Sequence, residues 1–252
     1  MIIYNTNTFE KFKIKPVSPQ NLQNLPTMHS DGNLIYNVVT DNDGNSYDGI
    51  SINGKIWMAS NLRTSRFNDG VKIEKFYYGI YTTHSYYTED IFKDKERTGY
   101  YYNYHCINSG SLAPSGWHIP TIQEWEDMLK YVASKPQYNL SGGLNPWMSN
   151  IAKSLCSVDG WKQSNTKDTV GQDCDQNNIT GFDLYPAGYY NYYMREFAMF
   201  GTDAICVCAC DSINSVTNQE FYCVNASNDN GYIRKLNKMP VASAYTVRCI
   251  KD

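Results

Sequence analysis

Short apolar and β-branched runs, separated by Asn, Asp and Gly, make up the pattern of the chain from Leu34 onward. Over residues 34–59, the runs LIYNVVT, YDGISI and IWMA alternate with the turn sequences DNDGNS and NGK. Such runs are typical of strands that hairpin turns connect. The pattern predicts a meander or paired hairpins in this part of the chain.

One helix is predicted to begin after Thr121. Pro120 precedes it, and Thr121 and Glu124 have the spacing of a capping box. Apolar side chains then recur at helical spacing, at Ile122, Trp125, Met128, Leu129 and Val132. The pattern therefore indicates a helix with one buried face that ends before Pro136. A weaker helical pattern covers residues 150–158.

Short β-prone runs return after Gly181. They are FDLYPAGYYNYY, AICVCAC, EFYCVNA and AYTVRCI, again with Gly and Asn between them. Strands, then one or two helices, then strands again predict an α+β fold with a mostly antiparallel sheet. The charged run DIFKDKERTG, at residues 90–99, is expected to be a solvated loop.

The start of the chain has a different pattern of apolar and polar residues. The stretch KIKPVSPQNLQNLPTM has no sustained period of 2 or 3.6 residues, which indicates an extended segment. We expect a docking arm over residues 1–37 and a globular domain over residues 38–252. The arm is more apolar than ordinary solvated tails, although a disordered tail is the alternative. The arm residues expected to dock are Ile2, Ile3, Phe9, Phe12 and Ile14.

Composition narrows the range of functions. A chain of 252 residues with 42% hydrophobic content can bury one sizeable core. Its 22 basic and 25 acidic residues are scattered, so nucleic acid is not an expected partner. No window approaches ~18 consecutive apolar residues, and no secretory signal is evident at the start. We therefore expect no membrane span and a protein that is made and kept in a cytoplasm.

Eight cysteines are present: Cys106, Cys156, Cys174, Cys206, Cys208, Cys210, Cys223 and Cys249. An even number suits a disulfide framework in a secreted protein, but reduced thiols are expected where no signal is found. Cys206, Cys208 and Cys210 alternate along a predicted strand, so they share one face. We interpret them as buried apolar side chains. A disulfide or a site for a soft metal is the alternative, although a zinc site needs a second ligand cluster.

The motifs of common enzymes are missing. The chain contains no GxSxG, P-loop, GxGxxG or HExxH sequence, so we expect no enzyme. His118 is expected to have a structural role beside the predicted helix. Two acidic loops, at residues 41–45 and 173–178, carry oxygens of the kind that calcium binds. We interpret the first as a hairpin turn and the second as a solvated loop, and calcium is the one cofactor kept as an alternative.

Tyrosine is unusually frequent, with 22 residues, and it offers a large rigid contact area. AT-rich coding is the alternative explanation for this composition. The candidate ligand or surface contacts form two groups: Tyr77, Tyr78, Tyr81, Tyr86 and Tyr87, and then Tyr189, Tyr190, Tyr192 and Tyr193. About half of them are expected to line the core, because the other aromatic residues are few for a domain of this size.

Several longer motifs resemble a known family. They are DNDGNSYDGISINGKIWMASNLRT, FNDG, GYYYNYHCIN, LAPSGWHIPTIQEWEDML, ITGFDLYPAGYY and YTVRCI. In this order they resemble the Fibrobacter succinogenes major paralogous domain, which occurs in surface proteins of Bacteroidota and in some of their phages. The resemblance covers about residues 38–252, and WMASNL and GWHIPT are its most specific parts. It implies a compact domain related to C-type-lectin-like and formylglycine-generating-enzyme folds, with a role in adhesion or display.

The chain departs from this family in two places. Ala113 stands where the family commonly has a cysteine, and the resemblance implies that this cysteine would pair with Cys249. Its loss favours a protein that folds in a reducing cytoplasm. The run AICVCAC is the second departure, because relatives usually have an aromatic and serine-rich strand there.

These observations lead to one expected function and two alternatives. We expect a non-enzymatic virion protein of a Bacteroidota phage, such as a head fibre or decoration protein, assembled in the host cytoplasm as a homo-oligomer. Its arm would dock on a capsid or tail protein, and its lectin-like domain would bind a host-surface glycan or a neighbouring virion protein. The first alternative is a bacterial cell-surface adhesin or lipoprotein domain with disulfides. The second is a thiol or metal-dependent enzyme of the formylglycine-generating type, with a metal at residues 206–210.

Overall fold

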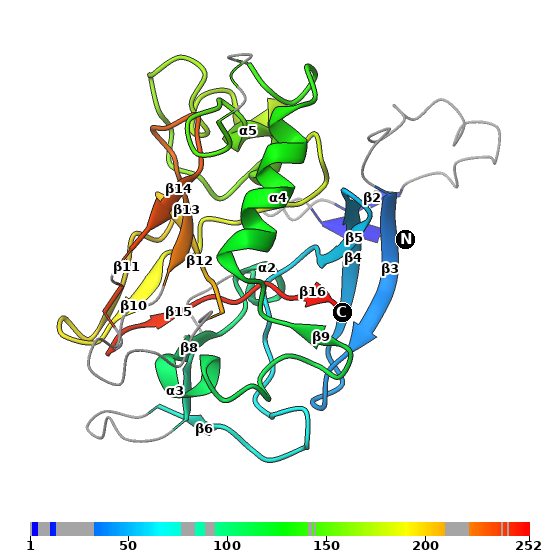
Figure 1. The fold of residues 1–252 in the computed structure, drawn as a ribbon, viewed down its shortest axis with the longest axis vertical. Helices are drawn as coiled ribbons and strands as arrows, with labels where there is room; N and C mark the ends of the chain where they lie inside the picture. Colours follow the sequence, from blue (N-terminus) through cyan, green and yellow to red (C-terminus); the bar gives the residue numbers. More distant parts are fainter. Residues whose placement is uncertain are drawn as a thin grey trace.

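The fold is taken from a computed structural model. It describes residues 34–76, 84–88, 94–140, 143, 145–209, 222–237, 239–240 and 242–252, and the backbone of residues 2–4, 11–13 and 33. Helices are few and short, and most of the regular structure is in strands (Figure 1). The predicted α+β class is therefore confirmed. No helix within these ranges is long and apolar enough to cross a membrane.

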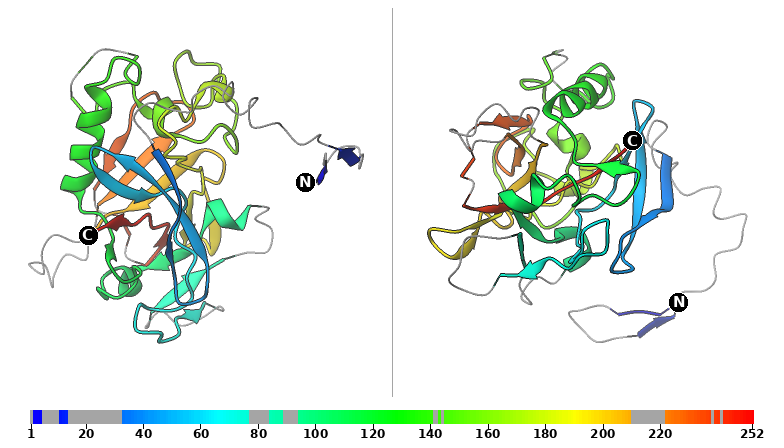
Figure 2. Two further views of the ribbon diagram at one scale, coloured as in Figure 1. Left: turned by 90° about the vertical axis from the view of Figure 1, so that its right-hand side faces the viewer. Right: turned by 60° about the horizontal axis from the view of Figure 1, so that its bottom comes forward.

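A five-stranded sheet forms one side of the domain, with the order β3-β4-β5-β16-β9, and it faces the viewer in the left view of Figure 2. Its strands are β3 (Asn33–Thr40), β4 (Ser46–Ile52), β5 (Lys55–Met58), β16 (Ile250–Lys251) and β9 (Trp117–His118). All of its pairings are antiparallel. The hairpins predicted over residues 34–59 are confirmed, and the end of the chain lies inside this sheet. Because β3 begins at Asn33 and pairs with β4, the expected boundary between arm and domain after residue 37 falls inside a strand of the domain.

The β4–β5 turn explains why the sequence has Asn-Gly at this point. Ile52 pairs with Lys55, so Asn53 and Gly54 form a two-residue loop. Both have positive φ, 53° and 73°, as a type I′ turn requires. Asn and Gly adopt this conformation more easily than other residues, and the register of the hairpin follows from it.

A six-stranded sheet has the order β11-β10-β15-β8-β7-β6, and a three-stranded sheet has the order β12-β13-β14. The first is made of β11 (Glu196–Ala198), β10 (Tyr189–Asn191), β15 (Ala244–Tyr245), β8 (Tyr101–Asn103), β7 (Ser85–Tyr87) and β6 (Glu74–Lys75). The second is made of β12 (Asp203–Val207), β13 (Cys223–Ser227) and β14 (Arg234–Leu236). Only the β6–β7 pair is parallel among the described strands. In the arm, β1 (Ile2–Tyr4) pairs with β2 (Lys11–Lys13).

The main helix is α4 (Ile122–Ala133), and it begins as the sequence predicts. The Thr121 side chain accepts from the backbone of Glu124, whose carboxylate accepts from the backbone of Thr121, so the capping box is complete. The weaker pattern at 150–158 contains only the short helix α5 (Ala152–Leu155). The other short elements are α2 (Lys95–Thr98), α3 (Tyr104–Ile107) and the 3₁₀ helix η1 (Cys174–Gln176).

Helix α4 joins two sheets through one hydrophobic core. Trp125 of the helix lies 4.9 Å from Trp57 of β5, measured between ring centroids. The same cluster includes Cys206, Val224 and Cys208, which lie on or next to the three-stranded sheet. Figure 1 shows α4 between the two sheets, and the shared cluster explains how one amphipathic helix holds both.

A second core cluster lies behind strand β12. Ile205 and Val207 point into it, whereas Cys206 lies in the first cluster with Cys208. The alternation predicted for this strand is therefore confirmed. Ala113 and Cys249 are both buried in the second cluster, as expected if a cysteine in place of Ala113 would pair with Cys249 in relatives.

Candidate functional site

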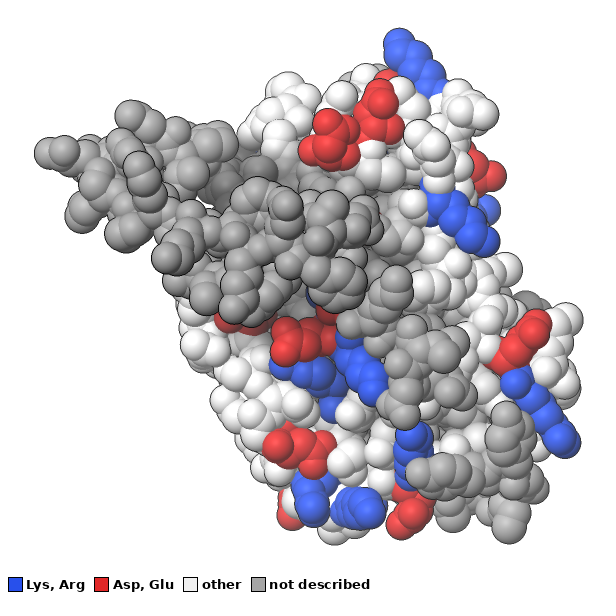
Figure 3. Space-filling model, turned by 180° about the vertical axis from the view of Figure 1, so that it is seen from behind, with Lys and Arg blue, Asp and Glu red and all other residues white. Residues whose placement is uncertain are grey.

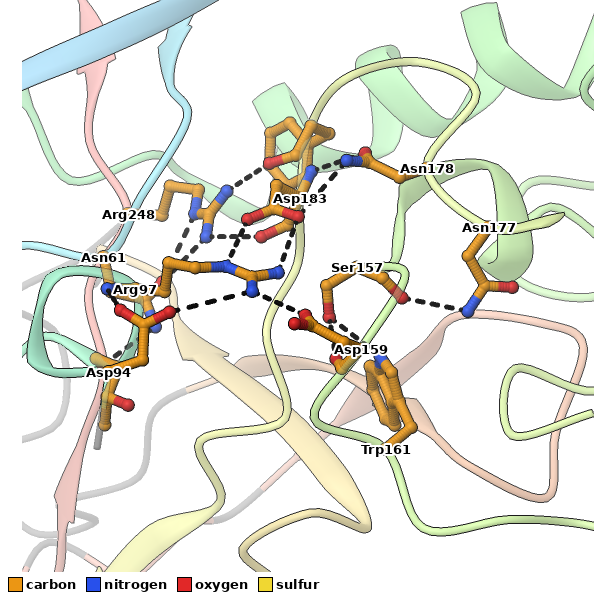
Figure 4. Close-up of polar contacts among 12 residues, drawn as sticks. Asn61, Asp94, Arg97, Ser157, Asp159, Trp161, Asn177, Asn178, Asp183 and Arg248 are labelled. Atoms are coloured by element: carbon orange, nitrogen blue, oxygen red, sulfur yellow. Dashed lines mark hydrogen bonds and ion pairs between the residues drawn. The ribbon is translucent and has the colours of Figure 1, made fainter. Parts of the chain in front are cut away.

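The site is built around a buried arginine, Arg248, which lies just before β16. Its side chain is fully enclosed, with no exposed surface. The guanidinium donates to Asn61 Oδ1 from Nε (3.3 Å) and Nη2 (3.1 Å), and to the backbone oxygens of Phe182 and Asp183. It also lies 4.8 Å from the centroid of the Phe182 ring. Its contacts fasten three distant segments of the chain together (Figure 4).

The partners of Arg248 are held by contacts of their own. Asn61 Nδ2 donates to the carbonyl oxygen of Thr98 at 3.1 Å. The next residue, Gly99, has a φ of 70°, and an added Cβ would lie 2.6 Å from Cβ of Asn61. Only glycine fits this approach, because both the backbone conformation and the space exclude a larger side chain. The end of α2 is thereby pressed against the segment that carries Asn61.

Arg97 lies on the outer side of the same network. Its Nε and Nη2 atoms form a bidentate pair with Asp183 at 2.8 and 2.9 Å, and Nη1 contacts Asp159 at 2.5 Å and Asp94 at 3.7 Å. The guanidinium also lies 4.6 Å from the centroid of the Tyr185 ring. Asp183 thus contacts Arg248 through its backbone and Arg97 through its side chain (Figure 4).

The two guanidinium groups have opposite electrostatic environments. Burial lowers the pKa of Arg248, and its four hydrogen bonds go to uncharged oxygens. Partial burial also acts to lower the pKa of Arg97, but the hydrogen bonds and charges of Asp183 and Asp159 outweigh it and raise that pKa. Arg97 therefore stays charged and is held firmly in place.

An open groove of about 880 Å³ lies beside Arg97 and Asp183, against β3 and β4. Its lining is mostly polar: Asn37, Ser46, Asp48, Ser60, Arg63 and Asn178 are among the side chains around it. Leu34 and Ala59 supply apolar surface. A volume of this size is within the usual range for small-molecule and cofactor sites.

Some of the unusual backbone conformations of the chain lie at this groove. Three of its non-glycine residues have positive φ: Asn37 at 52°, Asn178 at 63° and Asp183 at 57°. Asn178 and Asp183 lock each other, since the Asp183 N–H donates to Asn178 Oδ1 (2.8 Å) and Asn178 Nδ2 donates to Asp183 Oδ1 (3.2 Å). Strain of this kind clusters at binding and catalytic sites, so the groove is the candidate functional site.

A family model of the Fibrobacter succinogenes major domain matches residues 50–251. The chain belongs to the Fibrobacter succinogenes major domain family. Asn61, Arg97, Asp183 and Arg248 all lie within the matched range, so the buried network joins parts of the family domain. Residues 34–48, which line one wall of the groove, lie before the match.

Comparison with curated proteins and with solved structures gave no match. The kinship of this Fibrobacter succinogenes major domain with the C-type-lectin-like and formylglycine-generating-enzyme folds therefore stays a prediction.

The predicted tyrosine contacts separate into core and surface residues. Tyr87 and Tyr190 are buried, and their rings stack on each other with centroids 4.1 Å apart, so their assignment as surface contacts is wrong. Tyr86 and Tyr189 are half-buried and stack on Tyr100 and Tyr245. Among the six candidate tyrosines that the structure describes, only Tyr193 is largely exposed, at 75%, and Tyr192 lies half-buried beside it. Tyr77, Tyr78 and Tyr81 lie outside the described residues.

The interpretation of the cysteines at 206–210 as buried apolar side chains can be checked for Cys206 and Cys208. Cys206 and Cys208 are buried in the core, as the apolar interpretation requires, and burial raises the pKa of the Cys206 thiol. Cys210 lies outside the described residues. Within the described part of the chain, seven cysteines are present as free thiols, and no group of His, Cys, Asp or Glu is arranged to hold a metal ion.

In both acidic loops, oxygens that could face a cation accept hydrogen bonds from groups of the protein. The Asp41 carboxylate already accepts from the N–H groups of Asp43 and Asn45, the Asn45 amide and the Tyr47 hydroxyl, which makes the loop a hairpin turn as predicted. In the second region, Lys153 Nζ donates to the backbone oxygens of Thr169, Gln172 and Asp173. An ammonium group thus occupies the position where these carbonyl oxygens would otherwise face a cation.

His118 has the structural role that the sequence predicts. Its Nδ1 lies 2.6 Å from Asp252 Oδ1, and its Nε2 lies 2.9 Å from Glu124 Oε1. The ring therefore bridges β16 and the start of α4. The docking-arm residues Phe9 and Ile14 lie outside the described residues, and for Ile2, Ile3 and Phe12 only the backbone pairing of β1 with β2 is described.

The residues that build the groove were not found from the sequence. Residues 94–99 are not a solvated loop, because they form α2 and carry Arg97, and residues 90–93 lie outside the described residues. Arg248 offered the clearest signal, because a charged residue in the apolar run AYTVRCI must find hydrogen-bond partners if it is buried. Arg97 and Asp183 come from segments 86 residues apart, so only the fold brings them together.

Proposed function

We propose that this Fibrobacter succinogenes major domain is a non-enzymatic binding protein displayed on the virion of a Bacteroidota phage. In this proposal the groove beside Arg97 and Asp183 binds a host-surface glycan, and the arm docks on a capsid or tail protein. The open, polar, partly strained groove of about 880 Å³ is the observation that carries the proposal.

The groove has the chemistry that sugar hydroxyls need. A hydroxyl donates one hydrogen bond and accepts others, so a glycan site benefits from donors and acceptors side by side. Arg63 and Asn37 supply donors, whereas Asp48 and Glu96 supply carboxylate acceptors. The apolar surface of Leu34 and Ala59 suits the C–H faces of sugar rings.

The thiols support a non-enzymatic role. Burial raises the pKa values of the Cys106, Cys156 and Cys206 thiols, and a nucleophilic or metal-binding cysteine needs the opposite shift. The carboxylate of Asp183 is likewise occupied by its bidentate contact with Arg97. These contacts favour binding over the alternative of a formylglycine-generating type of enzyme.

The virion assignment is supported by the cysteine pattern. Cys249 is buried beside Ala113 in one core cluster and carries a free thiol, which suits assembly in a reducing cytoplasm. A cell-surface adhesin is the alternative. An antibody against the chain will label phage particles in the first case and whole bacterial cells in the second.

The glycan proposal is tested with labelled full-length protein and Bacteroidota cells. We expect binding that is lost when periodate cleaves the vicinal diols of the cell-surface glycans. Ser60→Trp, which fills the groove, should reduce binding at least tenfold, and the exposed control Ser115→Trp should not. Binding that resists both periodate and Ser60→Trp would contradict the proposal.

A further inference from the structure

We infer that the groove selects uncharged glycans and rejects sialylated, sulfated or phosphorylated ones. This inference rests on the proposed glycan binding and names the class of ligand. It follows from which charged side chains around the groove already have partners and which do not.

Arg97 has little capacity to hold an anion. Its Nε, Nη1 and Nη2 atoms all contact carboxylates, two of them in the bidentate pair with Asp183. The ring of Tyr185 lies over the guanidinium. An acidic glycan would have to displace an aspartate from this cation, and Asp183 is itself locked by Asn178. The positive charge of Arg97 is thus neutralised within the protein, because three aspartates surround its guanidinium.

Arg63 is the second cation at the groove, and its geometry is restricted. Its guanidinium lies 4.6 Å from the centroid of the Tyr47 ring, and Nη2 donates to the Ser46 carbonyl oxygen at 2.9 Å. One N–H group and one face of the guanidinium are therefore in use. The remaining N–H groups can donate to a neutral hydroxyl without any loss of charge pairing.

Two carboxylates that line the groove together carry more negative charge than Arg63 carries positive charge. Asp48 accepts one backbone N–H, from Asn37, and Glu96 is exposed. Neither forms an ion pair within the described residues, so both are acceptors for sugar hydroxyls. With Arg63 and Arg97 against Asp48, Glu96 and Asp183, the lining carries a formal charge of −1; behind it, Asp94 and Asp159 add two negative charges and the buried Arg248 adds one positive charge. An acidic ligand would meet repulsion here, whereas a neutral one would not.

The surrounding surface does not reverse this balance. On the described part of the face seen from behind, acidic and basic side chains lie next to one another, and no extended basic patch is visible there (Figure 3). The described residues of that face therefore give no source of long-range attraction for an acidic polymer.

The test uses full-length protein on an array of neutral, sialylated and sulfated glycans. The best neutral ligand is then measured by calorimetry beside the same glycan oxidised to carboxylate at its primary hydroxyls. We expect binding at least tenfold weaker after oxidation. Glu96→Gln, a change at an exposed side chain, should narrow this difference, and the control Glu126→Gln, at a half-buried position of α4 where the carboxylate pairs with Lys130, should leave it unchanged.

The outcomes separate the inference from the proposed function. Equal or tighter binding of acidic glycans would overturn the selectivity while glycan binding stands. A difference that Glu96→Gln and Glu126→Gln change equally would also overturn it, because the groove carboxylates would not be the cause. A protein that binds no glycan of any class would remove both the function and the inference.

Discussion

Arg248 and Arg97 are two arginines on opposite sides of Asp183, and they differ in almost every other respect. Arg248 is fully buried and bonds only neutral oxygens, two of them from the backbone. Arg97 is 23% exposed and is paired with three aspartates. The inner arginine joins chain segments, whereas the outer one shapes a wall of the groove.

This difference separates the contacts that hold the fold together from the contacts that shape the groove. A buried cation with uncharged partners is costly to disturb, because each freed oxygen would be left without a donor. A partly exposed cation among carboxylates is screened by water, and its loss leaves groups that water can reach. We therefore expect substitutions on the inner side to unfold the protein and substitutions on the outer side to alter the groove.

Arg248→Met is expected to have the largest effect. It leaves Asn61 Oδ1 and the carbonyl oxygens of Phe182 and Asp183 buried without their donor. A loss of about 3–5 kcal/mol in the free energy of unfolding should follow, measured by urea denaturation. Arg195→Met, at an exposed position, is the control and should stay within about 0.5 kcal/mol of wild type. A near-neutral Arg248→Met would show that the network does not support the fold.

Gly99→Ala is expected to have the next largest effect, because the new Cβ would press on Asn61 at 2.6 Å. We expect a loss of about 2–3 kcal/mol in unfolding free energy from steric contact and positive φ together. Gly116→Ala shares the positive φ but meets open space, so the difference between the two variants isolates the contact. Equal losses would mean that the approach to Asn61 does not matter.

Arg97→Gln should cost less stability and change the groove more. The Asp159 side chain is 66% exposed, so water can solvate it after the cation is lost. We expect a loss of about 1 kcal/mol in unfolding free energy, together with a clear fall in glycan binding by calorimetry. A loss as large as that of Arg248→Met would remove the distinction between the two sides.

The smallest expected effect is a pH dependence at His118. Partial burial acts to lower the pKa of its ring, but the hydrogen bonds to Asp252 and Glu124 outweigh it and raise that pKa above its ordinary 6.5. The stabilisation is therefore complete below pH 6.5 and is lost as the pH rises through the higher folded value. Wild-type Tm should fall more between pH 6 and pH 8.5 than that of His118→Gln. Parallel curves would contradict this role.

Much of the fold could be predicted from local patterns. The capping box of Thr121 and Glu124, the Asn53-Gly54 turn and the alternation at Cys206 each depend on residues close in sequence, and the structure confirms all three. The order of strand-like and helix-like runs predicted the α+β class, which the structure confirms. The family motifs predicted the membership of the domain, which the family model confirms.

The groove could not be predicted in the same way. Asn61 and Arg248 are separated by 187 residues, and neither has a local pattern that names its partner. The tyrosine groups misled for a related reason, because Tyr87 and Tyr190 look alike in sequence to Tyr193 but become buried when β7 and β10 enter one sheet. Burial of a polar or aromatic side chain is a property of the tertiary fold.

The most direct test of glycan binding in the groove is an NMR titration of isotope-labelled full-length protein with the neutral glycan that binds most tightly on the array. Our account predicts that the largest amide shifts occur at Asn37, Ser60, Arg63 and Asn178, which line the groove. Shifts confined to the β10–β11 hairpin around Tyr193, with none in the groove, would contradict it.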